Sequence, residues 1–73
     1  MFEVKIKLKE VIENHPNKLT QKDLARMTGI REATISDFAR GSRTVINIEH
    51  LQKIANALNI TDIRELIDLV EKE

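Results

Sequence analysis

The chain has 73 residues, with 12 basic and 12 acidic side chains and no cysteine. A domain of this size has a small core, which is marginally stable unless it is well packed or a second chain adds burial. The absence of cysteine excludes a disulfide framework and a thiolate metal site. No apolar run approaches the roughly 20 residues of a membrane-spanning helix, so we expect one soluble cytoplasmic domain over residues 1–73.

The N-terminal segment alternates apolar and charged side chains, as a half-buried strand does. This interleaving of charge is also unlike the continuous apolar stretch of a signal peptide. The same residues fit a helical stripe, so the two patterns overlap here. We predict a short strand at about 2–6 and a first helix at about 7–14. Pro16 ends that helix, because proline disfavours helical geometry in the residue before it.

Two helices joined by a glycine are predicted next. Thr20 can cap the second helix, and Asp23 lies at the third helical position, which is the spacing of a capping box. This helix should span about 21–28. Gly29 tolerates the positive φ found just past a helix end, which permits a sharp turn into a third helix at about 31–39.

The last part of the chain carries two more helical stripes. Asn47 can cap a fourth helix at about 48–58. Asp62 and Glu65 have capping-box spacing at the start of a fifth helix, predicted at about 62–71. The predicted fold class is therefore all-α, with five helices and a short N-terminal strand. The apolar stripe of the fifth helix consists of Ile63, Leu66, Ile67 and Val70.

The segment from residue 20 to residue 41 meets the packing requirements of a tight helix crossing. The residue where the helices meet must be small, as Ala25 is, and the turn must reverse direction, as Gly29 allows. A branched apolar group must fill the corner, as Ile35 can. These features predict a helix-turn-helix whose second helix projects outward.

This segment resembles the Cro and phage-repressor (Xre-like) family, and in particular its short stand-alone members. The resemblance covers about residues 7–70 and implies a helix-turn-helix domain that binds double-stranded DNA. The residues that carry it are Thr20-Gln21, Asp23-Leu24-Ala25, Thr28-Gly29-Ile30, Thr34-Ile35-Ser36, Arg40-Gly41, Leu51, Ile54-Ala55, Leu58 and Leu66.

The resemblance also implies a role for individual residues. The third helix would lie in the major groove, and side chains before and after it would contact phosphates. By position, the base-reading residues would be Arg31, Glu32, Ala33, Ser36 and Asp37. The phosphate contacts would be Gln21, Arg40, Ser42 and Arg43.

Charge supports this reading only in part. Residues 20–43 hold five basic and three acidic side chains, and residues 47–73 hold three basic and six acidic ones. One end of the domain can therefore face an anion. Glu32 and Asp37, however, place carboxylates on the face meant for DNA, where they can accept from cytosine amino groups or simply lower affinity. Arg31 replaces the Ser or Thr that family members often have at the start of this helix, which weakens the cap by roughly 1 kcal/mol.

The sequence contains no catalytic constellation and no motif for a cofactor, a metal ion or a small-molecule ligand, so we do not expect an enzyme. We expect a sequence-specific transcriptional regulator, a repressor that occupies an operator. The alternative is a protein-interaction module or antitoxin-like component that keeps the fold.

We also expect a homodimer. A lone strand at 2–6 would need a partner strand, which a second chain would supply. Leu69, which lies away from the stripe of the fifth helix, also suggests contact with a second chain. In the alternative reading, residues 1–6 extend the first helix or fray, and the protein is a monomer.

Overall fold

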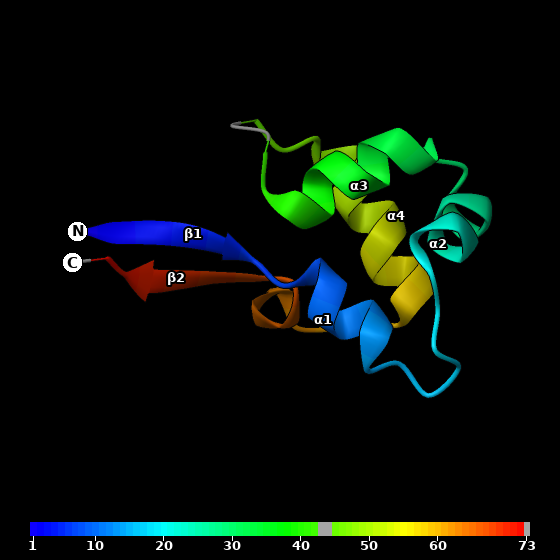
Figure 1. Ribbon diagram of the computed structural model, residues 1–73, viewed down its shortest axis with the longest axis horizontal. Coiled ribbons are helices and arrows are strands. Elements are labelled where there is room, and N and C mark those ends of the chain that lie inside the picture. Colours follow the sequence, from blue (N-terminus) through cyan, green and yellow to red (C-terminus); the bar gives the residue numbers. More distant parts are fainter. Residues whose placement is uncertain (43–44, 73) are drawn as a thin grey trace.

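The computed structural model describes residues 1–42 and 45–72. The helices pack into one body, and the two strands form a ribbon that projects from it along the longest axis, with both termini at its tip (Figure 1). In the described part of the chain, no helix is long and apolar enough to cross a membrane. The elements are β1 (Phe2–Ile6), α1 (Leu8–Glu13), α2 (Gln21–Thr28), α3 (Glu32–Arg40), α4 (Ile48–Leu58), the 3-10 turn η1 (Ile63–Glu65) and β2 (Ile67–Glu71).

The core lies where the four helices and η1 meet. Each α-helix contributes at least one buried aliphatic side chain, and no charged or polar side chain among the described residues is buried with them. Each of the first four predicted helices supplies part of this core. Its buried members are Leu8, Ile12, Leu24, Ile30, Ile35, Ile54, Leu58 and Leu66.

The predicted bounds of the second and fourth helices are confirmed, because their caps form as expected. Thr20 and Asp23 make a reciprocal capping box at the start of α2. Asn47 caps α4 by accepting a hydrogen bond from the backbone N–H of His50 at 3.2 Å. The first and third helices differ from prediction by one residue at each end, which is within the usual ambiguity of helix ends.

The predicted fold class is wrong in its C-terminal part. Residues 62–71 do not form a fifth helix; the chain makes η1 and then β2. Residues 1–42 and 45–72 thus hold four α-helices and a two-stranded antiparallel sheet. Ile67, Asp68 and Leu69 alternate apolar and charged side chains and thus also fit a strand, which the helical stripe concealed. The strand form prevails because it pairs with β1, from Phe2 opposite Glu71 to Ile6 opposite Ile67.

The predicted N-terminal strand is confirmed, but the reason given for a second chain is not. β1 finds its partner strand within the same chain. Two further backbone bonds continue the pairing, from Lys7 N–H to the carbonyl oxygen of Leu66 and from Lys72 N–H to that of Met1, both at 2.7 Å. The backbone groups of β1 that face β2 are therefore satisfied without any other chain.

Candidate nucleic-acid interface

The first turn of α2 is held by a closed set of hydrogen bonds. Thr20 Oγ1 accepts from the backbone N–H of Asp23 at 3.1 Å, and Asp23 Oδ2 accepts from the backbone N–H of Thr20 at 3.0 Å. Arg26 Nη2 lies 2.6 Å from Asp23 Oδ1. The hydrogen bonds from Thr20, followed by the one from Arg26, lower the pKa of the Asp23 carboxyl below its ordinary value. The turn fixes the position of Gln21, the first residue of α2, whose side chain is half-buried.

The corner between α2 and α3 has the predicted geometry. Gly29 has φ +74° and donates its N–H to the carbonyl oxygen of Ala25 at 2.9 Å. A Cβ at Gly29 would meet no atom within 4 Å, so the backbone conformation is what requires glycine here. Ile35 is fully buried beneath the corner, and Ala25 packs against the same core. These contacts fix the direction in which α3 leaves the body.

The outer face of α3 carries the predicted base-reading residues. Arg31, Glu32 and Ala33 are exposed, whereas Ser36 and Asp37 are half-buried. Ala33, Ser36 and Asp37 lie three or four residues apart and therefore share one side of the helix. The Arg31 side chain makes no capping hydrogen bond, as the sequence predicted. The structure thus places these five side chains on the start and the outward side of one helix.

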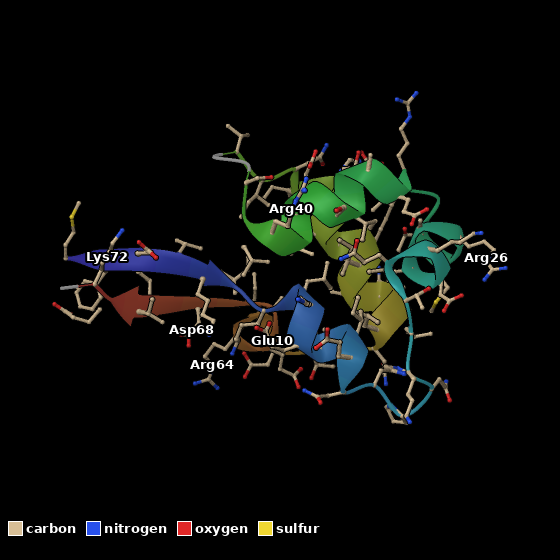
Figure 2. All side chains as sticks on the ribbon, in the orientation of Figure 1. Glu10, Arg26, Arg40, Arg64, Asp68 and Lys72 are labelled. Atoms are coloured by element: carbon tan, nitrogen blue, oxygen red, sulfur yellow. The ribbon has the colours of Figure 1, made fainter. Side chains whose placement is uncertain are left out.

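Asp37 organises the C-terminal end of α3. Its Oδ1 lies 2.6 Å from Nη2 of Arg40, a residue that Figure 2 labels on this helix. Its carbonyl oxygen accepts from the backbone N–H of Ser42 at 3.2 Å and from the Ser42 hydroxyl at 3.1 Å. The arginine partly neutralises one of the two carboxylates predicted to face DNA. Arg43, predicted to contact a phosphate, lies outside the described residues.

Other ionic groups lie away from α3. Figure 2 shows Glu10, Arg64 and Asp68 around α1 and the base of β2, on the opposite side of the view from Arg40. Arg64 binds Asp62 through both carboxylate oxygens, with Nη2 to Oδ2 at 2.8 Å. The side-chain hydrogen bond from Arg64 is the main cause that lowers the pKa of Asp62 to about 2. The ion pair between Asp62 and Arg64 therefore lies on the side of the molecule away from α3.

Sequence reasoning missed two features of the site. The first is the ion pair between Asp37 and Arg40, whose spacing of three residues on a predicted helix could have indicated it. The second is an open cleft between the ribbon and the end of α3, to which Ile6 and Phe38 contribute. No local signal in the sequence marks this cleft, because it is formed by segments far apart in the chain.

A family model described as helix-turn-helix matches residues 8–66. The chain belongs to this helix-turn-helix family, which is of the Xre and Cro type. Comparison with curated proteins and with solved structures gave no match. The matched region of this helix-turn-helix protein holds all four α-helices and η1, and both strands lie outside it. Family membership makes the protein a helix-turn-helix DNA-binding regulator in general terms, and confirms the resemblance found in the sequence.

Proposed function

We propose that this protein is a sequence-specific transcriptional repressor that acts in the cytoplasm on nucleoid DNA, occupying an operator through the major groove. The observation that carries the proposal is the corner at Gly29, which presents the outward side of α3 without burying it. A helix held in this way can enter a groove about 12 Å wide. Double-stranded DNA is the ligand, and the proposal includes no small-molecule, membrane or catalytic role.

The proposed contacts with DNA are of two classes, contacts with base edges and contacts with phosphates. Base-edge contacts specify a sequence, whereas phosphate contacts set register and orientation. Ser42 can donate to a phosphate only after its hydroxyl turns away from the carbonyl oxygen of Asp37. The base-reading group comprises Arg31, Glu32, Ala33, Ser36 and Asp37, and the phosphate group comprises Gln21, Arg40, Ser42 and Arg43.

The two carboxylates of α3 favour selectivity over general affinity. Glu32 is exposed in the first turn, where the helix dipole also favours a negative charge. Asp37 is restrained by Arg40. Each carboxylate can accept from a cytosine amino group and is unmatched opposite the acceptors of guanine. We expect a site whose cytosine positions tolerate little substitution.

The regulator would act as a homodimer on a pseudo-palindromic operator. Two copies of α3 related by a two-fold axis read successive major grooves on one side of DNA when they lie about 34 Å apart. The half-sites should therefore be separated by one helical turn, about 10 base pairs between centres.

Selection from random duplexes, followed by binding measurements at several salt concentrations, tests the proposal. Arg31→Ala and Asp37→Ala should change the selected sequence, with losses of about 1–3 kcal/mol at individual base pairs. Arg43→Ala should weaken all duplexes about equally and make the salt slope shallower by about one unit. Arg64→Ala is the matched control, because it removes an arginine on the side of the molecule away from α3.

The same experiment examines the alternative function. A protein-interaction module that has kept the fold should bind duplex DNA poorly even at low salt. If Arg31→Ala, Asp37→Ala and Arg43→Ala all scale affinity uniformly, the assignment of α3 to the groove is wrong.

A further inference from the structure

Asp37 and Arg40 form an ion pair on the outward side of α3. Residues three apart on a helix are neighbours on its surface, and Arg40 Nη2 donates to Asp37 Oδ1 at 2.6 Å. The Arg40 side chain is 66% exposed and the Asp37 side chain 28%. In the proposed function, Asp37 contacts a base edge and Arg40 contacts a phosphate. The ion pair therefore joins a base-reading residue to a phosphate-binding one.

An ion pair in this position contributes little to folding. Water and salt screen exposed charges, and ordering two long side chains costs entropy. The interaction becomes stronger when DNA excludes water from the outward side of α3, because the local dielectric constant falls. The main consequence of the pair is therefore expected in the complex with DNA.

Asp37 is held at both its side chain and its backbone. Arg40 orients the carboxylate, and the carbonyl oxygen of Asp37 accepts from the backbone N–H of Ser42 at 3.2 Å and from the Ser42 hydroxyl at 3.1 Å. An acceptor fixed in this way loses little conformational freedom when a cytosine amino group donates to it. It is also poorly placed to adapt to a different base, so its fixed position favours selectivity.

Arg40 also offsets the negative charge of Asp37. A lone carboxylate on this side would be repelled by phosphates and would lower the affinity for every sequence. A guanidinium has five N–H donors, so Arg40 can donate to a phosphate oxygen while its Nη2 keeps the bond to Asp37. A carboxylate has about four lone-pair sites, so Asp37 can accept from a base while it keeps the bond from Arg40. The pair can thus connect a base edge to the DNA backbone.

We propose that Arg40 is a specificity-determining residue that acts through Asp37. Arg40 holds the carboxylate toward one base pair and neutralises it there, so the ion pair, and not Asp37 alone, reads that base pair. Arg40 is thus a positioning residue for base recognition in addition to its phosphate contact. The base is cytosine, whose exocyclic amino group is the donor that a carboxylate matches. This inference deepens the proposed function and rests on it.

Binding to two duplexes tests the proposal. One is the duplex that the parent protein selects, and the other has a changed base pair at the position where Asp37→Ala relaxes the selection. The measured quantity is the ratio of the two dissociation constants, which should be roughly 5- to 150-fold for the parent, as for one good base contact. Arg40→Ala should remove most of this discrimination although Asp37 is still present. The double variant should discriminate no worse than Asp37→Ala, because the two residues act as one unit.

Two control variants separate this role from a general loss of positive charge. Arg26→Ala breaks a matched ion pair on α2, where Arg26 Nη2 lies 2.6 Å from Asp23 Oδ1 at the same spacing, and should leave the ratio unchanged. Figure 2 shows Arg26 at α2, apart from Arg40 on α3. Arg40→Lys keeps the charge but loses the planar fork of donors, so it should keep the salt slope and regain the discrimination only in part.

Two further measurements exclude a merely structural role. The denaturant midpoint of Arg40→Ala should match that of the parent, since the pair is exposed. Glu32, the other carboxylate of α3, lies eight residues from Arg40, about 12 Å along the helix axis. The effects of Glu32→Ala and Arg40→Ala on binding should therefore be additive, in contrast to those of Asp37→Ala and Arg40→Ala.

An Arg40→Ala variant that weakened both duplexes equally, and so kept the ratio of the parent, would overturn the proposal and leave Arg40 as a phosphate contact only. Relaxation by Arg40→Ala at a base pair that Asp37→Ala does not affect would also overturn it, because Arg40 would then read a base directly. A parent that discriminates through Arg31 but not through Asp37 would remove this inference alone. A parent that selects no duplex would remove the proposed function as well.

Discussion

The helical body and the ribbon differ in how far their apolar side chains are buried. In the helical body, Leu24 and Ile35 are fully buried and Ile54 is 1% exposed, so the apolar stripes close on one another within one chain. In the ribbon, hydrogen bonding between the strands is complete within the chain, but Val4 and Leu69 remain largely exposed. The difference shows that strand pairing satisfies backbone groups without covering the side chains of the strands.

The largest expected effect is at the centre of the helical body. Ile35→Ala should lower the free energy of unfolding by about 2–5 kcal/mol, because the site is fully buried and leaves a cavity. Leu69→Ala should change it by no more than about 0.5 kcal/mol at concentrations low enough to keep the chain monomeric. Denaturant melts at such concentrations measure both. Equal losses at the two sites would contradict the contrast between body and ribbon.

The next effect concerns the crossing of α2 and α3. Ala25→Leu adds three carbons where these helices pack, and should cost about 1–3 kcal/mol through overpacking. Ala33→Leu is a suitable comparison, because Ala33 is exposed on the outward side of α3 and has room for the larger group. Thermal melts in which Ala25→Leu matched the parent would show that the crossing of α2 and α3 has room for the larger side chain.

The difference between the helical body and the ribbon also explains which parts of the fold could be predicted from the sequence. The helices around Gly29 depend on local signals, namely a capping box, a positive φ and stripes with a period near 3.6. Those signals lie within residues 20–41 themselves, so they can be read without knowing the rest of the chain. The segment 67–71 fits both a helix and a strand, and a partner strand 61 to 69 residues away, from Ile6 opposite Ile67 to Phe2 opposite Glu71, decides between them. No local pattern contains that information.

The candidate site shows the same division. The exposure of Arg31 and Glu32 and the burial of Ile35 follow from helical periodicity and were predictable. The cleft was not, because Ile6, Phe38 and Ile46 come from three separate parts of the chain. The roles of individual side chains at DNA remain predictions from family resemblance, which the binding experiments above address.

A smaller effect on stability is expected at the N-terminal caps of α2 and α3, which differ in their side-chain hydrogen bonds. Thr20→Ala should destabilise the protein by about 1 kcal/mol, because it removes the side-chain half of the capping box. Arg31→Ala should cost little stability, since the Arg31 side chain makes no capping hydrogen bond. Denaturant melts of the two variants provide the comparison. A loss at Arg31 as large as that at Thr20 would show that α3 is capped by another route.

The smallest effect lies at the base of the ribbon and depends on pH. Folding lowers the pKa of Asp62 from 3.8 to about 2, mainly through the side-chain hydrogen bond with Arg64. Its ionised form therefore stabilises the fold above pH 3.8, and this contribution is lost as the pH falls through about 2. The carboxylate is exposed to solvent, so the effect is modest and is weakened by salt. Asp62→Asn should flatten the acid limb of a stability profile in this pH range, while keeping an oxygen that can accept from the backbone N–H of Arg64. Arg64→Ala should flatten it in part, because the backbone N–H of residue 64 still donates to the Asp62 carboxylate. A profile that Arg64→Ala left unchanged would remove the ion pair as the cause.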